Sequence, residues 1–227
     1  EADIPDSAAP PTLPVDIEIP DWLSRLAPNE PRPPRPLRPS MPDDDGDRAT
    51  APGIVLSVAS QALARGRFAH RLFEVLPALP ADQRQDAATR MMAGQSDIAA
   101  DIAQQLVDDA MQVMAMPVLA PLFGDDALAE VSLSGVVGGN GVAGQIDRLH
   151  VGADRVLVAD FKTGPRPAAT PVSYTRQLAL YAGLLEQIYP EHQIVTWLVW
   201  TEVADVQEIV EPERKAALAA LVSAAPA

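Results

Sequence analysis

Two aspartates and a lysine stand near the ends of two neighbouring apolar stretches. The segment VLVADFKTG (156–164) begins with strand-forming residues and then places Asp160 and Lys162 two positions apart. Lys162 is one of only two lysines in a chain whose other cations are arginines. The preceding stretch, GQIDRLHV (144–151), carries Asp147. Carboxylates beside a cation can hold a divalent metal, or they can form a salt bridge on a solvated strand edge. The relative position of the two aspartates and the lysine decides between these two interpretations.

The turn around Gly152-Ala153-Asp154 predicts how the two stretches pair. A two-residue loop at 153–154 makes them an antiparallel hairpin. The facing pairs are then Val151 with Val156, Leu149 with Val158, Asp147 with Asp160, and Gln145 with Lys162. These side chains share one face because residues two apart in a strand point the same way, and facing Cβ atoms lie about 5 Å apart. A three-residue loop would instead place Asp160 diagonal to Asp147.

Two facing aspartates at this separation predict a metal ion. Both ionise readily only when a cation lies between them, and Mg²⁺ and Mn²⁺ prefer such oxygen ligands. A lysine beside the metal can orient or activate a water molecule, or stabilise charge that develops on a phosphate. The pattern therefore favours metal-dependent chemistry on a phosphate, with a solvated salt bridge as the alternative.

The elements that must position these residues fall into three parts. Residues 1–53 are rich in proline and acidic residues, which predicts a partly extended linker. Residues 54–123 predict a helical prefix, with Ser96 as the cap of its third helix. Residues 128–227 predict a catalytic α/β (α+β) core. Its predicted elements are strands at 129–137, 141–151 and 155–163, a helix at 172–189, strands at 193–203 and 206–210, and a helix at 212–224.

The composition limits the class of protein. The chain has no cysteine, which excludes disulfides, cysteine–zinc sites and iron–sulfur clusters within it. It has no apolar run of about 20 residues and no signal-peptide pattern, so a soluble cytoplasmic protein is predicted. The net charge of −14 argues against an autonomous grip on nucleic acid. An attached motor or a metal ion could still supply positive charge, and the start at Glu1 suggests a fragment of a longer protein.

Three motifs resemble the PD-(D/E)xK nuclease superfamily, and its RecB-like branch in particular. They are GQIDRL (144–149), VADFKTG (158–164) and RQLALYAGLL (176–185), the last with the Gln-x-x-x-Tyr pattern of that branch. Three further segments are similar to the C-terminal part of bacterial AddA-type helicase–nuclease subunits: PDWLSRLAPNEPRPPRPLRPS (20–40), GRFAHRLFEVLPAL (66–79) and LVWTEVADVQEI (198–209). The resemblance implies a restriction-endonuclease-like core, in which helices flank a central mixed sheet.

The resemblance also implies a role for the motif residues. Asp147, Asp160 and Lys162 would be catalytic, with Lys162 acting on the attacking water or on the phosphate. Asp147 and Asp160 would also bind the metal, together with His70 and the carbonyl of Phe161. Without the resemblance, a lone helical histidine such as His70 would more simply be exposed or structurally bonded.

Four more residues are weaker candidates. Gln177 and Tyr181 lie four apart on one helix face and would line the DNA path, unless they form a rim pair without substrate contact. Glu130 opens a predicted strand where the branch often has an acidic residue. Arg176 could contact phosphate or simply belong to a solvated helix face.

The function implied by the resemblance is that of a Mg²⁺-dependent deoxyribonuclease domain, with Mn²⁺ as a substitute and no iron–sulfur cluster. It would hydrolyse single strands of DNA, as an exonuclease, while a helicase portion of the same native chain delivers them during double-strand-break repair and recombination. An AddB-type second subunit is the expected partner, and no membrane is involved. The alternative is a nuclease-fold module that no longer cuts and instead docks or guides DNA.

Overall fold

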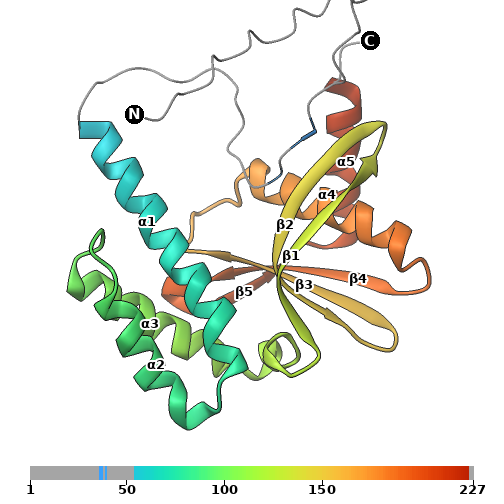
Figure 1. Ribbon diagram of the computed structural model, residues 1–227. Coiled ribbons are helices and arrows are strands. Elements are labelled where there is room, and N and C mark those ends of the chain that lie inside the picture. Colours follow the sequence, from blue (N-terminus) through green and yellow to red (C-terminus); the bar gives the residue numbers. More distant parts are fainter. Residues whose placement is uncertain (1–35, 38, 40–53, 225–227) are drawn as a thin grey trace, which may run out of the picture. The chain divides into compact units, whose positions relative to one another are not determined.

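The computed structural model describes residues 36–37, 39 and 54–224 (Figure 1). The predicted linker at 1–53 therefore lies outside the described residues, apart from three positions. One of them, Leu37, forms an isolated parallel bridge with Val142.

Three helices form the prefix that precedes the sheet. They are α1 (Ile54–Val75), α2 (Ala81–Ala93) and α3 (Ala100–Met114), with the 3-10 segments η2 (Leu76–Ala78) after α1 and η3 (Pro117–Phe123) after α3. α1 ends just before Pro77, whose nitrogen has no hydrogen to continue the helix. The predicted cap at Ser96 is wrong, because α3 begins only at Ala100 and the Ser96 hydroxyl donates to the Asp97 carboxylate.

Five strands form one mixed sheet in the order β1-β2-β3-β4-β5. They are β1 (Ala127–Val137), β2 (Asn140–Val151), β3 (Arg155–Lys162), β4 (Gln193–Trp200) and β5 (Asp205–Glu208), with the 3-10 segment η4 (Thr201–Val203) between the last two. β3 and β4 run parallel and are joined through helix α4 (Val172–Ile188), whereas the other neighbours are antiparallel. Helix α5 (Glu211–Ala224) packs against α4. The architecture confirms the predicted fold class, an α/β core with a mixed sheet, flanking helices and a helical prefix.

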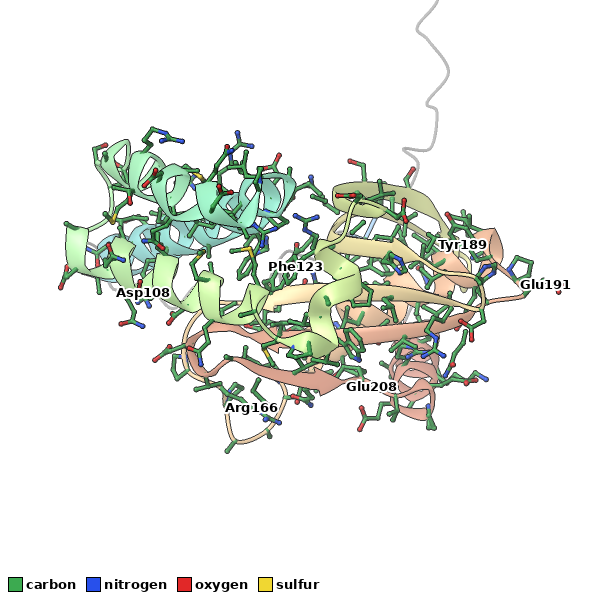
Figure 2. The ribbon with its side chains drawn as sticks, turned by 90° about the horizontal axis from the view of Figure 1, so that it is seen from below. Asp108, Phe123, Arg166, Tyr189, Glu191 and Glu208 are labelled. Carbon is green, nitrogen blue, oxygen red and sulfur yellow. The ribbon has the colours of Figure 1, made fainter. Side chains whose placement is uncertain are left out.

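The two faces of the sheet bury two different cores. Against the prefix, the rings of Phe73 in α1 and Phe161 in β3 stack with centroids 4.0 Å apart, and the Phe123 ring of η3 lies beside both. Figure 2 shows Phe123 where the prefix helices meet the sheet. On the opposite face, Val158 of β3 packs in the core that includes Leu178 of α4. Alternate residues of β3 thus serve opposite cores, as the two-residue period of a strand requires.

The predicted hairpin register is correct where β2 and β3 pair. The paired residues are Arg148 with Ala159, Leu149 with Val158, His150 with Leu157, and Val151 with Val156. Gly152 donates its N–H to the carbonyl of Arg155 and closes the turn, as a two-residue loop predicts. The ladder stops at Arg148, so the predicted pairings of Asp147 with Asp160 and of Gln145 with Lys162 do not form in the described sheet.

The alternation of side chains between the two faces of the sheet shifts by one position in β2 at Asp147; we call this shift the turn-over of β2. Ile146 and Leu149 pack in the same core beneath α4, although residues three apart in a regular strand point to opposite faces. Across from Asp147 in β1, Glu130 has a φ of 52°, a left-handed conformation that is uncommon for a residue with a side chain. The strand's alternation is therefore shifted by one position. The prediction that Gln145 shares a face with Leu149 is wrong for this reason.

Within residues 54–224, one bent pair of helices has the length and composition of a membrane span. No single helix in that range is long and apolar enough to cross a membrane. α3 and η3 pass the test of length and composition only together, with a bend of 98° between them. Apolar residues of both, such as Val113 and Leu119, are buried in the core against the sheet.

Candidate active site

The candidate site lies where β2 and β3 separate, at a point we call the fork, bounded by Asp147 on β2 and Asp160 on β3. Beyond the last ladder pair, the β1–β2 hairpin continues as a long two-stranded arm (Figure 1). At the fork, Phe161 donates its backbone N–H to Asp147 Oδ2 over 2.7 Å. A carboxylate thus takes the acceptor position that a strand carbonyl fills in a continued ladder.

On the β3 side, Asp160 and Lys162 form a close ion pair. Lys162 Nζ lies 2.6 Å from Asp160 Oδ2 and donates to Gln177 Oε1 of α4 at 3.1 Å. Gln177 Nε2 donates to the other oxygen, Asp160 Oδ1, at 2.7 Å. The same ammonium lies 4.2 Å from the centre of the Tyr174 ring, which is a cation–π contact. Three side chains therefore hold the Lys162 ammonium in place.

On the β2 side, three side chains of metal-ligand type converge. His70 Nδ1 of α1 lies 3.2 Å from Asp147 Oδ1 and 3.8 Å from Glu130 Oε1. One ligand atom from each of the three residues lies within 4.8 Å of the others. The turn-over of β2 and the left-handed backbone at Glu130 place both carboxylates on the side of α1, where His70 can reach them.

Burial and charge act in opposite directions on the pKa values of these groups. Burial lowers the pKa of His70, but hydrogen bonds to Asp147 and Glu130 and the nearby negative charge outweigh burial and raise it to about 10. Burial raises the pKa of Asp160 to about 6, against the opposing charge of Lys162. Burial lowers the pKa of Lys162, yet the charge of Asp160 outweighs burial, and the pKa lies above its usual value. At neutral pH both His70 and Lys162 carry a proton.

A cavity of about 1030 Å³ opens onto both sides of the fork. Its lining includes His70, Glu130, Gln145, Lys162, Tyr174 and Gln177, with Arg67, Arg71 and Leu63 of α1. Asp147 and Asp160 lie behind this lining, only 8% and 3% exposed. Although the chain carries a net charge of −14, the lysine and the arginines of this lining give an anionic ligand positive groups to meet.

The predicted catalytic residues come together at the fork. Asp147, Asp160 and Lys162 arrive from two strands, and His70 arrives from α1. Phe161 lines the cavity and bonds Asp147 through its N–H, while the metal-binding role of its carbonyl stays a prediction.

The four weaker candidates lie at different distances from the site. Glu130 lies within the ligand cluster, whereas Arg176 is half-buried and is not among the described residues that line the cavity. Gln177 lines the cavity, and its amide bonds both Asp160 and Lys162. The DNA contact of Tyr181 stays a prediction; its side chain is 0% exposed, and its hydroxyl bonds the backbone of Gln145.

Tyr174 is a site residue that the sequence interpretation missed. Its ring supports the Lys162 ammonium on one side and packs near Trp200, with ring centroids 6.0 Å apart. The available signal was its spacing, since Tyr174 precedes Gln177 by three positions and so lies on the same helix face. Nothing in the pattern, however, distinguishes an aromatic residue that serves the site from one that fills the core.

The residues at the fork fit a divalent metal. Asp160 Oδ2 is buried, and the group that meets it among the described residues is the Lys162 ammonium, 2.6 Å away. The carboxylates supply the oxygen ligands that Mg²⁺ and Mn²⁺ prefer, the imidazole nitrogen is a ligand of first-row divalent ions, and soft metals prefer sulfur ligands. The donor set therefore agrees with the predicted chemistry.

Comparison with known proteins yields one family match. The model of the PD-(D/E)XK nuclease superfamily matches residues 48–224. No curated protein matches the chain. Among solved structures, the crystal structure of SSO0001 is similar to 60% of this chain and 67% of that chain, with 19% identity and a TM-score of 0.32. Likeness at that level carries no argument about function, so the family match alone bears on it.

Proposed function

Since the chain belongs to the PD-(D/E)XK nuclease superfamily, we propose that it is a metal-dependent DNA nuclease whose active site is the fork. The observation that carries the proposal is the convergence of His70, Glu130 and Asp147 within 4.8 Å, directly beside the pair formed by Asp160 and Lys162. A purely structural polar cluster has no need for an open cavity of about 1030 Å³ with cations in its lining. Phosphodiester hydrolysis needs room for the substrate and positive charge near the phosphate.

The metal would be held by His70, Glu130 and Asp147, with Asp160 beside them. A bound divalent ion supplies a Lewis acid that lowers the pKa of water and neutralises charge on a phosphate oxygen. His70 must give up its proton before its nitrogen can act as a ligand. The buried aspartates have little access to water. Because water screens them little, their negative charge interacts strongly with a cation at the fork.

Lys162 serves the reaction as a fixed cation. Its raised pKa keeps it protonated at neutral pH, so it stabilises negative charge on the phosphate and does not act as a general base. Gln177 and Tyr174 of α4 hold its ammonium in addition to Asp160. Groups fixed in this way do not have to reorganise as charge develops in the transition state.

The substrate would enter past α1. Arg67 and Arg71 lie on the exposed side of that helix and line the cavity, and Arg71 is paired with Glu74 at 2.6 Å. Their guanidinium groups suit the phosphate groups of a nucleic-acid strand. The remaining acidic surface favours delivery of the strand by an attached partner.

The finer proposals rest on the similarity of residues 20–40, 66–79 and 198–209 to AddA-type subunits. We propose Mg²⁺ as the metal, single-stranded DNA as the substrate and an exonuclease mode. The native setting would be a cytoplasmic helicase–nuclease chain that works with an AddB-type subunit in double-strand-break repair. The second candidate function, a docking or DNA-guiding module, is favoured only by the net charge of −14.

The proposal is tested with end-labelled oligonucleotides. The chain is incubated with single-stranded DNA, duplex DNA or single-stranded RNA, with Mg²⁺, with Mn²⁺, or with EDTA. The expected result is metal-dependent cutting of single-stranded DNA that is lost in EDTA. The assay is repeated in the complete helicase–nuclease assembly if the chain alone is silent. Absence of cutting there, with strand unwinding intact, would leave the docking module as the better account.

A further inference from the structure

We propose that Tyr181 is a positioning residue that fixes the width of the fork. Its hydroxyl makes two hydrogen bonds to the backbone of Gln145: it accepts from the N–H at 3.2 Å and donates to the carbonyl at 2.8 Å. We refer to these two bonds as the Tyr181 bridge. The inference deepens the proposed function and rests on it, because the fork is taken as the active site.

The Tyr181 bridge takes the place of a missing strand. β3 leaves β2 after the pair of Arg148 with Ala159, so the edge of β2 that faces away from β1 loses its partner beyond that point. Backbone groups in a partly buried position, such as those of Gln145, are costly to leave without a partner. Further along this edge, Leu37 bonds the carbonyl of Gly141 and the N–H of Ala143. Gln145 is the next residue on the same edge, and the Tyr181 hydroxyl satisfies both of its backbone groups.

Helix α4 thereby holds both sides of the fork at once. Gln177 bonds Asp160 on β3, and Tyr181, four positions later, bonds Gln145 on β2. Residues four apart lie one above the other on a helix, so their separation along the axis is fixed by the helix itself. The bond from Phe161 N–H to Asp147 Oδ2 crosses the fork between these two supports. The distance between the two aspartates therefore depends on α4 as well as on the sheet.

A glycine makes room for the Tyr181 bridge. A Cβ atom at residue 144 would lie 2.7 Å from both Cε1 and the hydroxyl oxygen of Tyr181. The stiff ring cannot move aside without carrying its hydroxyl away from Gln145. Gly135 offers a matched comparison, since a Cβ there would lie 2.7 Å from Cδ2 of Leu184, also on α4, where no hydrogen bond is at stake.

The test measures the fork directly and does not depend on cutting. Tyr181→Phe keeps the ring and removes the hydroxyl, and Tyr189→Phe removes a hydroxyl at the end of the same helix as a control. In the metal-free protein, NMR amide exchange is expected to become at least about tenfold faster at Gln145 and at Phe161. The Gly152 amide, which closes the β2–β3 turn, should be unchanged. Tyr189→Phe should leave all three amides unchanged.

Metal binding is the second readout. The affinity for Mn²⁺, followed by electron paramagnetic resonance, should fall about tenfold in Tyr181→Phe, as is typical when a group that orients metal ligands is removed. Gly144→Ala should weaken Mn²⁺ binding in the same direction, whereas Gly135→Ala should not. This glycine pair replaces the tyrosine variant if Tyr181→Phe fails to fold.

The two proposals fail in distinguishable ways. Unchanged exchange at Phe161 together with unchanged Mn²⁺ affinity in Tyr181→Phe would overturn the positioning role, even if the native chain cuts DNA. A native chain that cuts nothing while Tyr181→Phe shows faster exchange at Gln145 and Phe161 would overturn the nuclease function and leave the Tyr181 bridge in place.

Discussion

The two halves of the β2–β3 hairpin differ sharply in how they are built. In the closed half, where residues 148–151 pair with residues 156–159, a regular ladder joins apolar side chains such as Leu149 and Val158. In the open half, beyond Asp147 and Asp160, the ladder gives way to side-chain hydrogen bonds and ion pairs. One pair of strands thus provides both a rigid base and a polar site.

The difference shows where stability and chemistry are separated in this fold. The closed half buries apolar surface on both faces of the sheet and stabilises the fold through packing. The open half contains features that destabilise a fold: the left-handed backbone at Glu130 and the two buried aspartates Asp147 and Asp160. Such features are understandable where they create a binding site.

The largest effects are expected at the two aspartates of the fork, and Asp147→Asn is considered first. The change removes the charge that meets His70 and weakens the acceptor of the Phe161 N–H. Cutting should fall by at least about a thousandfold, as is seen when a central electrostatic group of an active site is lost. Turnover of labelled single-stranded DNA measures this loss, and thermal unfolding in EDTA checks that the closed half survives. An Asp147→Asn variant with native turnover would remove Asp147 from the site.

Lys162→Met should follow, with a loss of about a hundredfold or more in turnover. The variant keeps most of the length of the side chain but removes the ammonium that faces Asp160, Gln177 and Tyr174. Because Lys162 is not a metal ligand in this account, Mn²⁺ affinity should fall by less than it does in Asp147→Asn. Equal losses of metal affinity in both variants would contradict the separate role given to Lys162.

Val156→Ala is the complementary change in the closed half. Val156 is 0% exposed and pairs with Val151, away from the fork. The free energy of unfolding should fall by about 2 kcal/mol, which is typical for shortening a buried aliphatic side chain. Urea denaturation measures this fall, and turnover per folded molecule should stay at the native value. A large loss of turnover would show that the two halves are not independent.

His70 gives the open half a characteristic pH dependence. Its pKa is about 10 in the folded metal-free protein and about 6.5 in an unfolded chain. The stabilisation that protonated His70 gives is therefore fully present below about pH 6.5 and is lost as pH rises toward 10. In EDTA, the stability advantage of the native chain over His70→Gln should shrink across this window. Denaturation at several pH values measures it, and an advantage that grows with pH would contradict the assignment.

The same proton should compete with the metal. Below the pKa of about 10, each unit rise in pH should tighten Mn²⁺ binding by about tenfold as long as one proton is displaced. Calorimetry in buffers of different ionisation enthalpy counts the released proton. His70→Gln should show a weaker pH dependence over the same range. Identical pH profiles would place His70 outside the metal site.

The smallest effect is expected at Tyr174. Tyr174→Phe keeps an aromatic face beneath the Lys162 ammonium, whereas Tyr174→Leu removes it. Turnover should drop about fivefold in the leucine variant and stay near native in the phenylalanine variant, in keeping with a cation–π contact of modest strength. The Michaelis constant should change little. Equal losses in both variants would indicate that the hydroxyl of Tyr174, and not its ring, supports the site.

The sequence predicts the closed half well and the open half only in part. The turn chemistry and the matched apolar residues fix the register of Leu149 with Val158, and the same pattern places Asp147 near Asp160. The period of a strand does not predict where that period breaks. The shift in β2 lies across from the left-handed Glu130 of the neighbouring strand, a residue distant in the chain.

The position of Tyr181 was not predictable from the sequence for a related physical reason. Helix periodicity places Gln177 and Tyr181 on one face, but it does not tell whether that face meets a substrate or the edge of a strand. Here β3 does not pair with β2 beyond Arg148, and the Tyr181 hydroxyl bonds both backbone groups of Gln145 instead. The approach of His70 to Asp147 likewise arises from packing of α1 on the sheet. Such contacts require the assembled fold.

The central claim is that the fork is a metal-dependent site for cutting DNA. The most direct test compares cutting of end-labelled single-stranded DNA by the native chain, Asp160→Asn and Asp109→Asn, in Mg²⁺ and in EDTA. Asp109 is also a buried aspartate, bonded to Gln105 on α3 and remote in sequence from the fork. The account predicts cutting by the native chain and Asp109→Asn in Mg²⁺ alone, and none by Asp160→Asn. Cutting by Asp160→Asn at the native rate, or cutting that persists in EDTA, would contradict it.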